Sequence, residues 1–160
     1  MSTTILGIDP GSHRLGWGVI TGNANKQVYL ASGCIESKPG TPPDVYLPHI
    51  SREFSVIIDS YSPTHLGLET LLFQKNITTA ISVAEARGVI RLVAAEHHLP
   101  VLESAPNTIK LAVAGNGSAS KLEVTRMVGL LLGINVGGKL DDELDALAVA
   151  ISTLVTNKKL

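Results

Sequence analysis

The sequence predicts an α/β fold with a mixed five-stranded sheet, made of a three-strand meander and two further parallel strands, flanked by helices. Two observations predict this fold. Three short apolar runs separated by turn residues come first, and segments of helical spacing then alternate with two more such runs. With 160 residues, 44% of them hydrophobic, the chain is long enough for one packed core. We expect residues 1–160 to form a single domain.

The composition excludes several classes of protein. No apolar run approaches the length of a membrane span, and the N-terminus lacks a basic region followed by a hydrophobic one. Cys34 is the only cysteine, so an internal disulfide is impossible and a reducing cytoplasm is the expected location. The formal net charge of −1 does not indicate a nucleic-acid binder. It does not exclude one, because acids in a site subtract from the total while basic residues gather elsewhere.

The first three strands follow from turn residues. Pro10-Gly11 stops the first apolar run at Asp9, and Gly22-Asn23 separates the second run from the third. Gly16 and Gly18 share one face of the second strand, which predicts the close approach of another backbone. The predicted strands are 4–9, 15–20 and 28–35.

The helices follow from apolar residues at helical spacing. In the helix within 44–61, Pro48 fits only the first turn, so we expect this helix to begin near residues 45–47. Ser118 or Ser120 is expected to cap the helix that begins at Lys121. The remaining predicted elements are a strand at 65–70, a helix at 77–98, a strand at 101–103, and helices at 106–113, 121–132 and 141–156.

Three separate elements each deliver a carboxylate. Asp9 ends the first strand and Glu69 ends an apolar strand, while Asp142 and Asp145 lie on one face at the start of the last helix. Helix capping alone would explain Asp141 or Asp142, but not Asp145 beside the apolar stripe. A buried acid costs free energy unless a positive group binds it. The pattern therefore predicts a divalent-metal site, with hard oxygen ligands suited to Mg²⁺ or Mn²⁺ rather than zinc.

Four short sequence motifs occur in order between about residues 4 and 153. They are Gly7-Ile8-Asp9-Pro10-Gly11, Leu68-Glu69, Gly115-x-Gly117-x-x-x-Lys121 and Asp142-x-x-Asp145-Ala146-Leu147-Ala148. Together these blocks resemble the motifs of RuvC-type Holliday-junction resolvases. The first block alone would be weak, because actin-like kinases and chaperone ATPases carry a similar start.

The resemblance implies a ribonuclease H-like fold and a homodimeric, metal-dependent endonuclease. Such an enzyme resolves Holliday junctions by paired symmetric nicks in DNA recombination and repair, and leaves 5′-phosphate ends. The resemblance also suggests that the protein acts together with the branch-migration proteins RuvA and RuvB. Our candidate for the dimer interface is the long alanine-rich helix that begins at Ile77.

The resemblance also assigns site residues. Asp9, Glu69, Asp142 and Asp145 would be the catalytic acids and hold two Mg²⁺ or Mn²⁺ ions per active site, with Asp141 as the helix cap. Lysines that the family places near the site map onto Lys110 and Lys121. Lys121 is expected to neutralise the phosphate or to position water.

One departure from the family lies after Glu69. Resolvases of this type usually carry an aromatic residue three positions later, where this chain has Leu72, followed by Phe73. Either residue could contact the bases at the crossover, and Phe73 could instead anchor the loop. Phosphate-directed DNA contacts are expected from Arg14, Lys75, Arg87, Lys110 and Lys121.

Three other classes of protein share parts of this sequence pattern. An actin-like ATPase has the first motif, but that fold uses two such domains to clamp a nucleotide. A catalytically inactive junction-binding module would not need the complete set of acids. A related single-domain ribonuclease H-like nuclease acting on structured RNA is the strongest alternative.

Overall fold

The sheet is the frame on which the other elements are placed. The computed structural model describes residues 3–71 and 77–157, and its five strands lie in the order β3-β2-β1-β4-β5. β1, β2 and β3 form an antiparallel meander, whereas β4 pairs in parallel with β1, and β5 with β4. This is the predicted mixed sheet. The strands are β1 (Thr3–Pro10), β2 (Arg14–Asn23), β3 (Lys26–Glu36), β4 (His65–Glu69) and β5 (Val101–Ser104).

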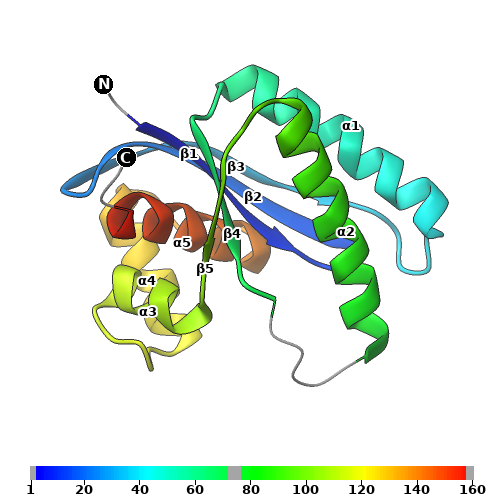
Figure 1. Ribbon diagram of the computed structural model, residues 1–160. Helices are drawn as coiled ribbons and strands as arrows, with labels where there is room; N and C mark the ends of the chain where they lie inside the picture. Colours follow the sequence, from blue (N-terminus) through cyan, green and yellow to red (C-terminus); the bar gives the residue numbers. More distant parts are fainter. Residues whose placement is uncertain (1–2, 72–76, 158–160) are drawn as a thin grey trace.

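Helices cover both faces of the sheet (Figure 1). On one face, α1 and α2 bury a cluster that includes Phe54, Leu66 and Ile90. On the other face, α5 lies against β1 and β2, with α3 and α4 packed on it, around Leu147 and Ile151. The helices are α1 (Pro43–Tyr61), α2 (Ile77–Glu96), α3 (Pro106–Ala114), α4 (Lys121–Leu132) and α5 (Asp141–Thr156).

Most elements match their predicted ranges within a few residues, but the predicted start of α1 is wrong. The helix begins at Pro43, so Pro48 lies inside it, beyond the first turn. Pro43 takes a first-turn position, where its missing N–H and fixed φ are favourable. Pro48 is exposed, and so is Asp44, whose carbonyl would otherwise accept a bond from residue 48. Water can reach that carbonyl, which is how the helix tolerates the proline.

The approach of α5 to the sheet depends on glycines. A Cβ atom at Gly16 would lie 1.9 Å from the backbone oxygen of Asp142, and one at Gly7 would lie 2.2 Å from that of Ala146. At Gly18 the nearest atom would be a Leu147 methyl carbon at 2.6 Å. The close approach predicted for β2 is confirmed, and its partner is the first turns of α5. This contact places the acids of α5 beside the end of β1.

Within the described residues, none of the helices has the combination of length and apolar character that crossing a membrane requires.

Candidate metal centre

Asp9 is the centre of the candidate site. It stands near the end of β1, opposite Gly16 of β2, and its side chain is largely withdrawn from water. Burial, followed by the charges of Asp145, Asp142 and Glu69, raises the pKa of Asp9 to about 7. The charges of the other three acids that the sequence indicates therefore act on Asp9.

Glu69 reaches the same place from the neighbouring strand. It ends β4, which runs parallel to β1, so both carboxylates emerge at one edge of the sheet. Burial and the charge of Asp145 raise the pKa of Glu69, while Lys110 and Arg87 oppose that shift. A cavity of about 210 Å³ joins these groups, and its lining includes Asp9, Glu69, Lys110, Lys121 and Asp145.

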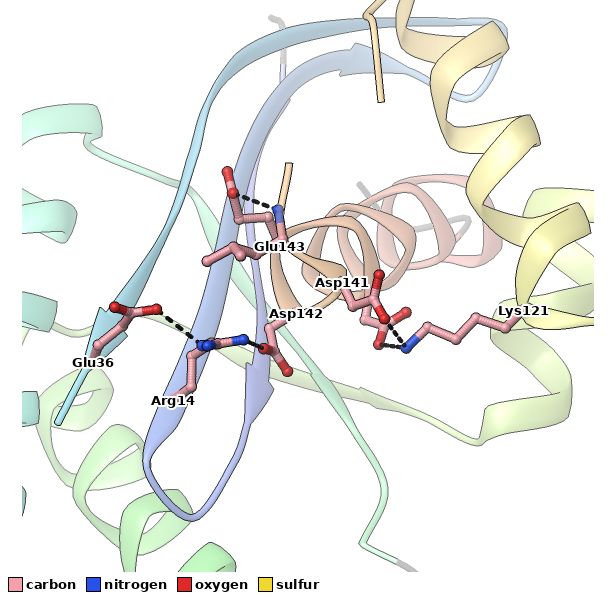
Figure 2. A network of polar contacts seen from close by, with 8 residues as sticks. Arg14, Glu36, Lys121, Asp141, Asp142 and Glu143 are labelled. Carbon is pink, nitrogen blue, oxygen red and sulfur yellow. Dashed lines mark hydrogen bonds and ion pairs between the residues drawn. The ribbon is translucent and has the colours of Figure 1, made fainter. Parts of the chain in front are cut away.

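The two α5 acids of the candidate site, Asp142 and Asp145, are each paired with a cation from another element (Figure 2). Arg14 approaches the first turn of α5 from one side, and its Nη1 lies 3.1 Å from Oδ2 of Asp142. Lys121 approaches from the opposite side, and its Nζ lies 2.9 Å from Oδ2 of Asp145 and 3.6 Å from Oδ2 of Asp141. These cations offset part of the repulsion within the cluster of acids.

Lys121 is held at the first position of α4 by a capping box. Ser120 Oγ accepts a hydrogen bond from the backbone N–H of Glu123 at 3.2 Å. Glu123 Oε2 in turn accepts one from the backbone N–H of Ser120 at 2.6 Å. Of the two serines that the sequence offers as caps, Ser120 is therefore the one used.

Asp141 is not the helix cap, which corrects the expectation. Leu140 occupies the N-cap position, and Asp141 is the first helical residue. Because leucine has no side-chain acceptor, capping comes from Glu143, whose Oε2 accepts a hydrogen bond from the backbone N–H of Leu140 at 3.0 Å. Asp141 is exposed and forms an ion pair with Lys121 instead.

A polar network that the sequence analysis missed fixes the start of α5 on β3. Oε1 of Glu143 accepts a hydrogen bond from Ser32 Oγ at 2.9 Å. Lys139 Nζ donates to Ser32 Oγ at 2.9 Å and to the Tyr29 hydroxyl at 3.2 Å, and lies 3.6 Å from Glu143 Oε1. The i, i+4 spacing of Lys139 and Glu143 is the one signal in the sequence that could have found it. The network leaves Glu143 pointing away from the acids of the site.

Arg87, one of the predicted phosphate contacts, is engaged within the protein. Arg87 is only 9% exposed. Its guanidinium donates one hydrogen bond to the backbone oxygen of Glu69 and another, at 2.5 Å, to Oε1 of Glu103. Arg91 also contacts Glu103. These contacts anchor the end of β4 and so position Glu69. Arg87 also lines a hollow together with Asp9 and Glu69, so its predicted contact with phosphate stays a prediction. The other predicted DNA contacts Leu72, Phe73 and Lys75 lie outside the described residues.

The donor set fits a divalent cation. Carboxylate oxygens are the ligands that Mg²⁺ and Mn²⁺ prefer. The raised pKa of Asp9 reflects first its burial and then the negative charge of the neighbouring acids, which Lys121 only partly offsets. Over residues 3–71 and 77–157, no three acidic, histidine or cysteine side chains already converge as a ligand set. Asp142 and Asp145 each direct a carboxylate oxygen toward a cation of the protein, Arg14 and Lys121 respectively.

Comparison with known families decides the classification. Residues 5–153 match the model of the family described as crossover junction endodeoxyribonuclease RuvC. The chain belongs to this family. A RuvC of Pseudothermotoga lettingae is 41% identical to it over 146 residues, which cover 91% of this chain and 90% of the relative. A RuvC of Heliobacterium modesticaldum is 44% identical over 147 residues, covering 92% and 91%.

Solved RuvC structures agree with this assignment. Thermus thermophilus RuvC in complex with a Holliday junction substrate superposes with a TM-score of 0.88 and 30% identity, covering 94% of this chain and 92% of that one. The yeast mitochondrial Holliday junction resolvase Ydc2 shares the fold, with a TM-score of 0.69 at 14% identity, covering 96% and 78%. The fold is therefore ribonuclease H-like, as the resemblance implied.

Proposed function

We propose that this RuvC-family protein is a metal-dependent endonuclease that resolves Holliday junctions by paired symmetric nicks in DNA recombination and repair. The nicks leave 5′-phosphate ends that can be ligated. The observation that carries the proposal is that the charges of Glu69, Asp142 and Asp145 all act on the partly buried Asp9. Such a concentration of negative charge suits divalent cations, which can in turn hold a phosphate diester. The match of residues 5–153 to the RuvC family supports a DNA junction as the substrate.

The four acids would hold the metal ions. Asp9 would be the shared ligand at the centre, with Glu69 on one side and Asp142 and Asp145 on the other. The ions, two Mg²⁺ or Mn²⁺ per active site, would activate the attacking water and stabilise the leaving oxygen. Asp142 and Asp145 would then exchange their contacts with Arg14 and Lys121 for contacts with these ions.

Basic residues would hold the phosphate. Lys121 has a side chain 57% exposed and already points at the acids, so its ammonium group can neutralise a phosphate oxygen or position water. Lys110 lines the same cavity and would add a second positive charge. Arg14 and Lys75 would contact phosphates further out, and Leu72 or Phe73 would contact the bases at the crossover.

We also propose a symmetric homodimer formed by α2. Ile81 and Leu92 are 58% and 59% exposed, and Gly88 lies between them with nothing within 4 Å of an added Cβ. Their spacing of seven and four residues puts all three on one face of the helix. A two-fold dimer would match the two equivalent strands of a junction.

The expected setting of the enzyme follows from its family. We propose that residues 1–160 act as one nuclease domain in the cytoplasm, alongside RuvA and RuvB. These assignments rest on the resemblance in sequence.

The deciding experiment compares substrates. A synthetic four-way junction, the matched linear duplex and a structured RNA are incubated with the protein and Mg²⁺ or Mn²⁺, and the nicks are mapped on every strand. We expect paired nicks at symmetric positions on two strands of the junction and little cleavage of the other two substrates. Preferential cleavage of the RNA would instead support the alternative nuclease, and unpaired nicks in duplex DNA would contradict the proposal.

A further inference from the structure

Arg14 bridges two carboxylates that come from different elements. Its Nε lies 2.9 Å from Oε1 of Glu36, its register partner across β2 and β3. Its Nη1 lies 3.1 Å from Oδ2 of Asp142 in the first turn of α5. Figure 2 shows the guanidinium between the two acids, with a contact to each. One side chain thus links the β2–β3 pair to the acidic end of α5.

The contact to Asp142 conflicts with metal binding. A guanidinium stays protonated in proteins and only donates hydrogen bonds, so it cannot share a ligand oxygen with a metal ion without repulsion. Asp142 is one of the four acids assigned to the ions under the proposed function. A divalent cation that takes Oδ2 of Asp142 would therefore compete with Arg14 for that oxygen.

The geometry allows Arg14 to be displaced. The side chains of Arg14, Glu36 and Asp142 are 45%, 54% and 29% exposed, and exposed ion pairs are weak. When Asp142 turns away, Nε of Arg14 keeps its partner in Glu36. The arginine is then neither buried nor left without a counter-charge, so the exchange carries no large penalty.

We propose that Arg14 is a displaceable counter-ion of Asp142, which balances this carboxylate in the metal-free protein and must retreat onto Glu36 before Asp142 binds a divalent ion. The inference deepens the proposed function and rests on its metal site. It assigns Arg14 a positioning role at Asp142 that is separate from a contact with DNA. Arg14 should therefore weaken metal binding, in the absence of DNA, by about the two- to fivefold that an exposed ion pair is worth.

The test measures Mn²⁺ affinity by isothermal titration calorimetry, without DNA, on the full chain at neutral pH. Arg14→Gln should bind Mn²⁺ about two- to fivefold more tightly than the wild type. Arg14→Lys keeps the charge but offers one ammonium group in place of two separate donors, so its affinity should lie between these two. Unchanged circular dichroism and melting in chelator would show that each variant is folded.

Lys38→Gln is the matched control for long-range charge. Lys38 is exposed and lies between Ser37 and Pro39, which line the same hollow as Arg14 and Asp142. Within the described part of the chain, Lys38 makes no ion pair with Asp142, so its removal should leave Mn²⁺ affinity near that of the wild type.

The outcomes separate three explanations. Equal Mn²⁺ affinity of Arg14→Gln and the wild type would overturn the counter-ion role and leave the metal site intact. An equal gain in Lys38→Gln would also overturn it, because the effect would then come from the general field of the protein. No detectable Mn²⁺ binding by the wild type would contradict the metal site itself, and with it the proposed function.

Discussion

At the scale of single residues, the site is a set of acids whose charges are unequally balanced. Asp142 and Asp145 have cation partners at 3.1 and 2.9 Å. Asp9 is partly buried, and only the charge of Lys121 lowers its pKa. Asp9 should therefore be the acid whose charge costs the fold most. The same acid stands on the central strand, where a shared ligand of two ions would have to be.

A pH dependence follows from the raised pKa of Asp9. Well below pH 3.8, Asp9 is protonated in both the folded and the unfolded state and contributes no difference. As the pH rises toward 7, the unfolded state releases this proton and the folded state retains it, so stability falls. In chelator, Asp9→Asn should therefore gain stability relative to the wild type between pH 5 and pH 8, by at most about 4 kcal/mol. Urea unfolding of both proteins at pH 5, 6 and 8 measures this, and a difference independent of pH would contradict it.

At the scale of elements, the site depends on how closely α5 approaches β1 and β2. The last helix supplies Asp142 and Asp145, and Gly7, Gly16 and Gly18 let its backbone lie almost on the strands. The polar network of Lys139 and Glu143 then fixes the first turn of α5 on β3. Small residues and one network thus set the position of two of the four acids.

Gly16→Ala tests this dependence. The added methyl would lie 1.9 Å from the backbone oxygen of Asp142, and a backbone atom cannot move away as a flexible side chain can. We expect a loss of about 1–3 kcal/mol in the free energy of unfolding, together with weaker Mn²⁺ binding. Gly117→Ala is the control, since the nearest atom to its added methyl would be the backbone oxygen of Asn107 at an ordinary 3.4 Å, so the free energy of unfolding should change little. Equal effects of the two substitutions would refute the close-approach argument.

The sequence predicted the elements of the site better than its side-chain contacts. The strands, the start of α5 and the grouping of the four acids follow from local patterns of apolar, turn and acidic residues. Arg14 and Asp142 are 128 positions apart, and Arg87 and Glu103 meet across two elements, so no local spacing encodes either pair. The position of Pro48 inside α1 was mispredicted for a related reason, because its tolerance depends on exposure in the folded protein.

At the scale of the whole molecule, one face of α2 is the surface that a second copy would cover. Junction resolution needs two cuts, and a single copy offers one cluster of acids. Ile81 and Leu92 supply apolar area on this helix that the described part of the chain does not bury.

We predict that the protein sediments as a dimer at micromolar concentration and that Leu92→Glu shifts it to a monomer. A charge in the core of an apolar interface is costly, which is the reason for the expected shift. Val56→Glu is the matched control, because Val56 on α1 is also 59% exposed but lies on another helix. A monomeric wild type, with or without junction DNA, would contradict the dimer.

The central claim is that Asp9, Glu69, Asp142 and Asp145 form a metal site and do not hold the fold together. The most direct measurement is the melting temperature of the wild type and of Asp9→Asn, in chelator and with Mg²⁺ or Mn²⁺, at neutral pH. Asp9→Asn should melt higher than the wild type in chelator, because it removes a charge that burial and then the other acids disfavour, and should gain less from the metal. Asp145→Asn should behave similarly but less strongly, because it also loses the ion pair with Lys121. If both variants melt well below the wild type in chelator, the acids support the fold through their own contacts, and the metal-site account is contradicted.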